Sequence, residues 1–408
     1  MKKYAIAGTG NRGLYMYGKP LVSKYTDVAE LVGLYDINTK RAKVFAEKLG
    51  RQIPVFEDFN DLLDVAKPDT IIVTTQDAFH HEYIIKSLQK GCDVITEKPM
   101  TTDEFKCNEI LKTERETGKK VTVTFNCRFM PFLLEIKKLM MQDIIGDITA
   151  VHFEWLLDQV HGADYFRRWH SIKECSGGLQ IHKATHHFDI INWLIDDEPR
   201  IVNAFGSLRY YGSNNPFKGK FCFNCEHKES CKFYIDKMKD DFFKEFYYNN
   251  MDMDGYAPNF CVYRKEINIE DTLSVNVRYS KGAVMSYTLT AYSPYEGYKI
   301  NISGTKGRLE IENYAGKYLP EPFKQVRHFD EQHNMTIIEI EEGRGSHGGG
   351  DSVLLDVLFN EITQDPYNQQ AGSRAGAMSA GIGIAVNNSM KEEKQIKIKD
   401  ILWELEVN

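Results

Sequence analysis

The sequence contains no uninterrupted hydrophobic run that approaches the length of a membrane span, so we expect no transmembrane segment. It also lacks a basic tail, stripe or patch, because its formal net charge is −7 and residues of both signs are interspersed. Nucleic acid and anionic membranes are therefore not expected as partners. After Met1-Lys2-Lys3 there is no signal-peptide hydrophobic region and no small-residue cleavage site, which predicts a cytoplasmic protein.

Paired cysteine spacings are missing from the first third of the chain, which holds Cys92, Cys107 and Cys127. Together with the missing secretion signal, this argues against a disulfide framework and favours reduced thiols. Internal repeats and low-complexity tracts are absent as well. The 408 residues leave room for two domains, each with a core of its own.

A glycine-rich turn follows the first apolar run, residues 4–7, and opens a segment expected to be helical. In that context G-x-G-x-x-G predicts a dinucleotide site, with the phosphates at the helix N-terminus. The first glycine makes the tight turn, the second lets backbone approach a pyrophosphate, and the third lets helix and strand pack closely. The turn consists of Gly8, Thr9, Gly10, Asn11, Arg12 and Gly13.

An acidic residue, Asp36, ends the next apolar run, residues 30–35. It stands about 20 residues after the turn, where a carboxylate binds the adenine ribose 2′-hydroxyl and repels a 2′-phosphate. No Arg follows at Ile37 or Asn38. The sequence therefore predicts NAD rather than NADP as cofactor.

Up to about residue 126, short apolar runs alternate with amphipathic segments, as in a parallel sheet covered by helices on both faces. We assign residues 1–125 to a doubly wound α/β dinucleotide-binding domain, with ligands beyond the carboxyl ends of its strands. The strands are expected at residues 4–7, 30–35, 70–74, 93–96 and 121–125. The helices between them are expected at residues 40–49, 59–65, 81–88 and 104–116.

The remaining residues, 126–408, are assigned to an α+β domain with an open-faced, mostly antiparallel sheet and helices on one face. A helical stretch is expected at residues 178–195, an irregular Cys-rich insertion at about 212–268, and closing helices at 352–359 and 375–390. The strands are expected at residues 148–157, 200–210, 271–279, 283–291, 298–303, 307–313 and 335–341.

The triplet Glu97-Lys98-Pro99 at the end of the fifth strand completes a pattern that resembles the Gfo/Idh/MocA family of oxidoreductases. This family includes glucose–fructose oxidoreductase and inositol dehydrogenase. The other matching segments are the turn at 8–13, Asp36, Thr75-Gln76-Asp77 with His80, Asn126-Cys127-Arg128-Phe129 with Pro131, Gly177-Gly178, His182, His186 and Asp189.

The resemblance implies a Rossmann domain, an open-faced sheet domain and hydride transfer between NAD(P) and a sugar, cyclitol or related polyol. The open sheet face would be a natural subunit contact, so we expect a homo-oligomer, either a dimer or a tetramer. Beyond the turn and Asp36, the cofactor residues implied are Thr75, Gln76, His80, Glu97, Lys98, Asn126 and Arg128.

The chain departs from the family pattern after its glycine pair. Family members commonly carry Asp-x-x-x-His there, whereas this chain has His182 where the Asp is usual. A second unusual segment, Ser346-His347-Gly348-Gly349-Gly350-Asp351, is similar to a His-Gly-Gly motif of the family's NAD-dependent glycosidase branch.

Lys98 is the catalytic candidate, because a Lys at the carboxyl end of a strand and before a Pro points into the nucleotide crevice. Burial beside the positive nicotinamide ring would lower its pKa toward the working pH. It could then remove a hydroxyl proton as hydride leaves the same carbon. The alternative is a solvated surface lysine.

His182 and His186 stand one helical turn apart, so they share a face if their segment is helical. We expect a proton relay or substrate binding, with zinc as the alternative for a pair at this spacing. Asp189 could orient a histidine or cap a turn. Further substrate contacts are expected from aromatic, Arg and His side chains before the glycine pair: Tyr165, Arg168, Trp169 and His170.

A separate cysteine constellation lies in the insertion. Two cysteines at x2 spacing with others nearby can hold a tetrahedral metal, here a structural zinc remote from the hydride-transfer centre. An iron–sulfur cluster and free thiols are the alternatives. The candidate ligands are Cys222, Cys225, Cys231 and Cys261.

These features favour an NAD-dependent oxidoreductase acting on a hydroxyl of a sugar, glycoside or cyclitol, with Lys98 as general acid and base. One alternative is a redox-neutral glycosidase or epimerase that oxidises the sugar transiently with bound NAD. Another is a nucleotide-binding regulator without turnover, since a fold does not imply activity.

Overall fold

A six-stranded parallel sheet forms the first half of the computed structural model, which describes residues 1–216, 219–315, 323–340, 343 and 345–406. The strand order is β3-β2-β1-β4-β5-β6, and every recorded pairing in this sheet is parallel. The strands are β1 (Lys2–Ala7), β2 (Ala29–Tyr35), β3 (Val55–Phe56), β4 (Thr70–Val73), β5 (Asp93–Thr96) and β6 (Val121–Val123). The helical segments are η1 (Gly13–Gly18), α1 (Lys19–Ser23), α2 (Thr39–Leu49), α3 (Phe59–Asp61), η2 (Leu62–Ala66), η3 (Asp77–Phe79), α4 (His80–Gln89) and α5 (Glu104–Thr117).

The parallel sheet forms because its strands are apolar on both faces, so helices must cover both. All four residues of β4 are buried, as are the last four residues of β1. The carboxyl ends of β1, β4 and β5 come together at one edge. That edge places the glycine turn, residues 74–80 and Glu97-Lys98 side by side.

The second half is a nine-stranded sheet in the order β14-β13-β12-β11-β7-β10-β9-β8-β15. Strands β7 and β10 pair in parallel, and the other recorded pairs are antiparallel. The strands are β7 (Ile148–Asp158), β8 (Pro199–Ser207), β9 (Thr272–Tyr279), β10 (Val284–Ser293), β11 (Glu296–Gly304), β12 (Gly307–Ala315), β13 (Phe323–Asp330), β14 (Met335–Ile338) and β15 (Ile396–Lys397).

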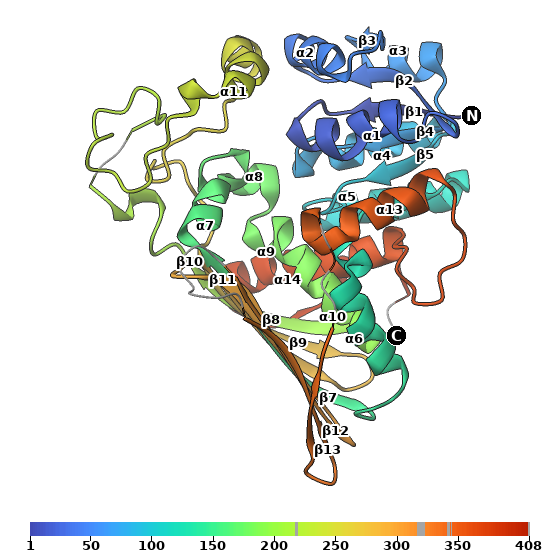
Figure 1. Ribbon diagram of the computed structural model, residues 1–408, viewed down its shortest axis with the longest axis vertical. Helices are drawn as coiled ribbons and strands as arrows, with labels where there is room; N and C mark the ends of the chain where they lie inside the picture. Colours follow the sequence, from blue (N-terminus) through green and yellow to red (C-terminus); the bar gives the residue numbers. More distant parts are fainter. Residues whose placement is uncertain (217–218, 316–322, 341–342, 344, 407–408) are drawn as a thin grey trace.

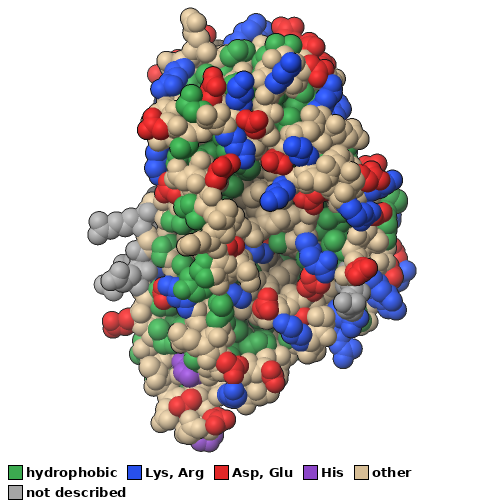
Figure 2. All heavy atoms as spheres, turned by 90° about the vertical axis from the view of Figure 1, so that its right-hand side faces the viewer, with side chains coloured by type: hydrophobic (Ala, Val, Ile, Leu, Met, Phe, Trp, Pro, Cys, Tyr) green, Lys and Arg blue, Asp and Glu red, His purple; other side chains and the backbone are tan. Residues whose placement is uncertain are grey.

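Helices cover one face of this sheet and the other face is open (Figure 1). Strand β9 shows the reason, because buried and exposed residues alternate along it. The main helices of this part are α6 (Pro131–Met141), α7 (Gln159–Phe166), α8 (Lys173–Ser176), α9 (Leu179–His182), α10 (Ala184–Ile195) and α14 (Ser373–Glu392). Helix α13 (Gly350–Phe359) instead packs against the first sheet, where Phe359 contacts Tyr4 of β1. A parallel doubly wound sheet followed by a mostly antiparallel one confirms the predicted fold class. Charges of both signs are interspersed on the face drawn in Figure 2.

The predicted insertion contains an irregular segment that leaves the second sheet and returns to it. We call its described residues, 219–268, the arm. Its two ends pair through a bridge between Phe221 and Phe260, and its tip carries α11 (Asp241–Phe246), η8 (Tyr248–Asn250) and α12 (Met251–Asp254). In Figure 1 the arm (yellow-green) reaches across to α2 of the first sheet. Lys48 and Glu245, one from each side, form an ion pair of 2.5 Å there.

Two expectations need correction. The helical stretch expected at 178–195 is interrupted at Lys183, which separates α9 from α10. Strand β13 was not expected, because Val326 is its only buried residue and its sequence shows little alternation. The strand expected at 335–341 is found as β14, which ends at Ile338, and residue 341 lies outside the described residues.

Candidate functional site

The glycine turn has the conformation that close approach to a ligand requires. Gly8 has a φ of +98°, and a Cβ there would lie 2.6 Å from the backbone of Thr74 and Thr75. At Gly13 a Cβ would lie 2.7 Å from the carbonyl oxygen of Gly8. At Gly10 it would meet nothing within 4 Å, so this glycine faces open space. The turn therefore fits the backbone cradle of a pyrophosphate.

Asp36 is held against this turn. Its carboxylate accepts hydrogen bonds from the Thr9 amide at 2.7 Å, the Thr9 hydroxyl at 3.0 Å and the Asn38 amide at 2.8 Å. The Asn11 amide donates to the hydroxyl of Tyr247, an arm residue, at 3.2 Å. The arm therefore covers the end of the crevice where an adenosine would lie.

Glu97 anchors the turn to the end of β5. Its carboxylate accepts from Arg12 Nε and from the Tyr17 hydroxyl, each at 2.7 Å. Burial alone would raise the pKa of Glu97, but Arg12 and these hydrogen bonds hold it below its usual value. The carboxylate thus stays ionised and fixes the arginine that opens helix η1.

His80 ties two of the strand ends together. Its ring nitrogens lie 2.8 Å from the Pro99 carbonyl oxygen and 3.1 Å from that of Thr75. Burial lowers the pKa of His80, although the contacts with both carbonyl oxygens oppose the shift. Thr75 and Gln76 are half-buried at the adjoining rim. His80 therefore positions the loop that carries Lys98 rather than presenting a free ring nitrogen.

Lys98 is half-buried at the crevice, where the catalytic candidate was expected. Its ammonium donates to the backbone carbonyl of His182 at 2.7 Å. Burial lowers its pKa to about 8, although Asp77 and Glu97 oppose the shift. A lysine with this pKa can take up and release a proton near neutral pH.

Asp77 is a functional candidate that the sequence analysis did not single out. It lies on η3, and its Oδ2 is 2.6 Å from Nδ1 of His182 in the other half of the molecule. Burial raises the pKa of Asp77 and lowers that of His182, so it disfavours the charged form of both groups. The only signal for Asp77 in the sequence was its place in the segment that resembles the family. No local sequence pattern indicated its contact with His182.

An aromatic cluster surrounds His182. Its ring centroid lies 4.1 Å from that of His170, 5.6 Å from Trp169 and 5.7 Å from Tyr165. Trp169 and Tyr165 are half-buried, and Tyr165 also packs against the hydrophobic core. The structure therefore brings these predicted substrate residues together. Arg168 is more exposed and pairs with Asp164 at 2.5 Å.

His186 and His170 each have a buried ring nitrogen without a hydrogen-bond partner among the described residues. In both rings this nitrogen is Nδ1. Burial lowers the pKa of both rings well below its usual value, so both are neutral. An unpartnered buried nitrogen costs about 1–3 kcal/mol, which a bound hydroxyl could recover.

Asp189 neither orients a histidine nor caps a turn, which corrects the expectation. It forms a buried two-pronged ion pair with Arg128, at 2.8 Å to Nε and 2.6 Å to Nη2. The third Arg128 nitrogen, Nη1, donates to the Asn368 carbonyl. These bonds use three of the five N–H donors of the guanidinium, and its contact with the cofactor stays a prediction.

Residues of the last third complete the crevice at Asp351. One oxygen of this carboxylate accepts from Asn126 at 2.6 Å, and the other lies 2.9 Å from His347 Nδ1 and 3.5 Å from Arg12 Nη1. These contacts hold the pKa of Asp351 at about 2 in spite of its burial. The Ser346–Gly349 segment thus meets the nucleotide turn.

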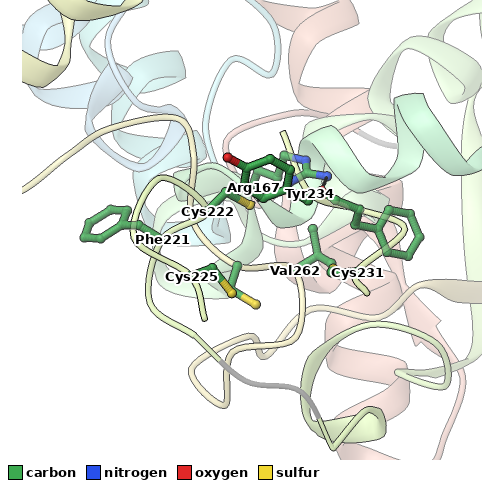
Figure 3. A pocket seen from close by; sticks show the side chains of 9 residues that line it. Arg167, Phe221, Cys222, Cys225, Cys231, Tyr234 and Val262 are labelled. Atoms are coloured by element: carbon green, nitrogen blue, oxygen red, sulfur yellow. Dashed lines mark hydrogen bonds between the residues drawn. The ribbon is translucent and has the colours of Figure 1, made fainter. Parts of the chain in front are cut away.

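The predicted metal ligands gather around one cavity in the arm. Cys222, Cys225, Cys231 and Cys261 all line it, together with Arg167 (Figure 3). Within the described ranges, no three His, Cys, Asp or Glu side chains form a group ready to hold a metal ion. That finding covers the alternative of zinc at His182 and His186, and it gives the predicted zinc no support from a preformed ligand set.

The fold and the crevice together define a class of protein, a two-domain oxidoreductase with a Rossmann dinucleotide site. The description "Oxidoreductase family, NAD-binding Rossmann fold" matches residues 2–125, and "Oxidoreductase family, C-terminal alpha/beta domain" matches residues 137–398. The chain belongs to this family, Gfo/Idh/MocA. In the part of the chain that the structure describes, no helix is long and apolar enough to cross a membrane.

Curated relatives match this chain over different lengths. YteT of Bacillus subtilis, which is named only as a putative oxidoreductase, is 37% identical over 98% of this chain and 99% of its own. Inositol 2-dehydrogenase of Gluconacetobacter diazotrophicus is 29% identical over 43% of this chain and 50% of its own. D-glucoside 3-dehydrogenase of Escherichia coli is 30% identical over 29% of this chain and 34% of its own.

Solved structures share the fold along the full chain. The WlbA dehydrogenase of Bordetella pertussis, solved with NADH and UDP-GlcNAcA, aligns with a TM-score of 0.67 at 19% identity over 100% of this chain and 99% of its own. A Caulobacter crescentus aldose–aldose oxidoreductase, solved with glycerol, aligns with a TM-score of 0.64 at 17% identity over 97% and 99%.

Proposed function

We propose that this protein transfers hydride between NAD and a carbon that carries a hydroxyl in a sugar, glycoside or cyclitol. The observation that supports it most is the half-buried Lys98 side chain just after the carboxyl end of β5, with its pKa lowered to about 8 and its Nζ 2.7 Å from the His182 carbonyl oxygen. Relatives named inositol and glucoside dehydrogenases favour such a substrate.

The cofactor site follows from the geometry of the turn. The open space over Gly10 would take the pyrophosphate, and Asp36 would accept a ribose hydroxyl. When bound, NAD supplies the acceptor for hydride. A 2′-phosphate would meet the Asp36 carboxylate, and this favours NAD over NADP.

Lys98 would act as the base in the oxidation. Its Nζ takes the hydroxyl proton while the carbon loses hydride, so that a carbonyl forms and the lysine becomes an ammonium. In the reverse direction the same ammonium returns the proton. Since burial brings its pKa to about 8, both forms are populated near neutral pH.

His182 and Asp77 would replace the carboxylate–histidine pattern that is usual in the family. With Asp77 ionised, its carboxylate would accept the Nδ1 proton of His182 across the 2.6 Å contact, and Nε2 of that ring would be an acceptor for a substrate hydroxyl. His186 and His170 offer further unpartnered nitrogens to the ring of a polyol. Asp77 is a positioning residue, because it acts through His182.

A redox-neutral glycosidase or epimerase is the second candidate. It is favoured by His347, which is exposed on the Ser346–Gly349 segment and joined to the crevice through Asp351. In this reaction the hydride would return to the substrate, so that no NADH accumulates.

The deciding experiment incubates the protein with NAD and a panel of inositols, free sugars and glycosides, and follows both NADH and the products. NADH rising with a ketone product supports the proposal. Product without NADH identifies the redox-neutral reaction. If NAD binds but every compound stays unchanged, a regulator without turnover is the better account.

A further inference from the structure

Two buried arginines lie next to the four cysteines of the arm. Arg167 is 5% exposed; its Nη1 donates to Cys222 Sγ at 3.3 Å and its Nη2 to the Phe233 carbonyl. Arg264 is 8% exposed and donates to the carbonyls of Phe166 and Cys261. Burial lowers the pKa of Arg264 to about 10, and Glu266 only partly opposes that shift. Buried charges without a counter-charge are costly, so the arginines imply negative charge nearby.

The cysteines are the groups that can supply this charge. A divalent ion bound by four thiolates leaves two negative charges, one for each guanidinium. Disulfides between the same cysteines would be neutral and would leave both arginines unbalanced. Two sulfurs already accept hydrogen bonds, Cys222 from Arg167 at 3.3 Å and Cys261 from the Tyr263 amide at 3.4 Å.

The size of the cavity favours a single ion. Its volume is about 10 Å³, close to what one water molecule needs, so the cavity as it stands is nearer in size to a single ion than to a cluster of iron and sulfur atoms. The four thiols share its wall without forming a ready ligand group, so binding would draw them together by side-chain rotation. Such closure is usual where metal binding is coupled to local folding.

The position of the cysteines suggests what an ion would do. The Cys222 amide donates to the Asn259 carbonyl at 3.0 Å, and the Cys261 amide donates to the Lys220 carbonyl at 2.9 Å. The four cysteines therefore sit where the arm leaves and rejoins the second sheet. At the tip of the arm, the Tyr247 hydroxyl accepts a hydrogen bond from the Asn11 amide in the glycine turn that follows the first strand of the parallel sheet.

We propose that Cys222, Cys225, Cys231 and Cys261 bind one divalent ion, zinc, whose tetrathiolate charge is balanced by Arg167 and Arg264 and which fixes the base of the arm over the cofactor crevice. The part that concerns the cofactor rests on the proposed function. The metal site itself does not.

The first test is elemental analysis of protein purified without chelator. We expect about one zinc per chain in the wild type and in Cys92→Ser, and little in Cys225→Ser. Cys92 is the matched control because its buried thiol donates to the Pro68 carbonyl at 3.1 Å, which a serine hydroxyl can also do. Metal-free wild-type protein from zinc-supplemented cells, or intact masses that reveal disulfides among the four cysteines, would overturn the site.

Cobalt gives a readout that does not depend on any variant folding. Replacing the native ion of the wild type with Co²⁺ should give the intense thiolate-to-metal absorption of a tetrahedral sulfur site. Cobalt bound without thiolate bands would contradict the ligand set. Limited proteolysis then tests the role of the ion, because its removal should speed cleavage within the arm. Retained metal without NAD binding would count against the proposed function alone.

Discussion

At the Lys98 end of the crevice the two halves of the molecule meet through buried titratable groups, whereas at the Asp36 end they meet largely through exposed ion pairs. Asp77 and His182 are 4% and 13% exposed in their side chains. Lys48 and Glu245, which join α2 to the arm, are 33% and 52% exposed. Burial makes charge interactions strong and shifts pKa values, while solvent screens them at the surface. We therefore expect substitutions at the Lys98 end to change turnover strongly, and substitutions in the exposed ion pairs at the Asp36 end to change cofactor binding only slightly.

Lys98→Met should have the largest effect. It removes the proposed base while keeping most of the side chain's volume, so turnover should fall by about 10²–10⁴-fold, as is typical for a lost general base. Affinity for NAD should change little in a calorimetric titration. Lys112→Met, at an exposed position on α5, is the control. Near-normal turnover by folded Lys98→Met would remove Lys98 from the mechanism.

Asp77→Asn should come next, with a loss of about 10²-fold in kcat, because the supporting partner of His182 loses its charge. A second readout separates this role from a merely structural one. The ionised Asp77 carboxylate raises the pKa of Lys98, so its removal should shift the pH profile toward lower pH. Asp77→Glu should recover part of the rate. An unchanged rate and profile would show that the contact is incidental.

Asp36→Asn should weaken NAD binding by about tenfold, the scale of one hydrogen bond to a charged acceptor. NADP should bind no more weakly than to the wild type, because the Asp36 charge that repels a 2′-phosphate is gone. The ratio of the two dissociation constants should therefore move closer to one. The measurement is a pair of dissociation constants, with Asp27→Asn at an exposed position as control. Tighter NADP than NAD binding by the wild type would refute the assignment of Asp36.

Lys48→Ala should have the smallest effect, no more than about threefold on the dissociation constant for NAD, because exposed ion pairs contribute little. The buried pair of Arg41 and Asp254 on the same surface, 8% and 13% exposed, provides the contrast. If Lys48→Ala weakened binding as much as Asp36→Asn, the distinction between the two ends would fail.

Sequence alone predicted the residues that follow strands, but not the contacts between elements that are distant in sequence. The glycine turn, Asp36 and Glu97-Lys98 could be placed because each follows a strand of a parallel sheet, whose order fixes their neighbourhood. The contact of Asp77 with His182 joins residues 105 positions apart across two sheets, and no local pattern encodes it. The helix break at Lys183 and the contact of Tyr247 with the turn were missed for the same reason.

The central claim is that burial makes Lys98 a base near neutral pH. It is tested most directly by the pH dependence of kcat/KM for NAD reduction, measured with a substrate deuterated at the reacting carbon so that hydride transfer is observed. We expect the rate to rise with pH and level off with an apparent pKa of about 8 or lower, since the positive nicotinamide ring also disfavours the ammonium. A rate still climbing toward the ordinary lysine pKa of about 10.4 would contradict the account.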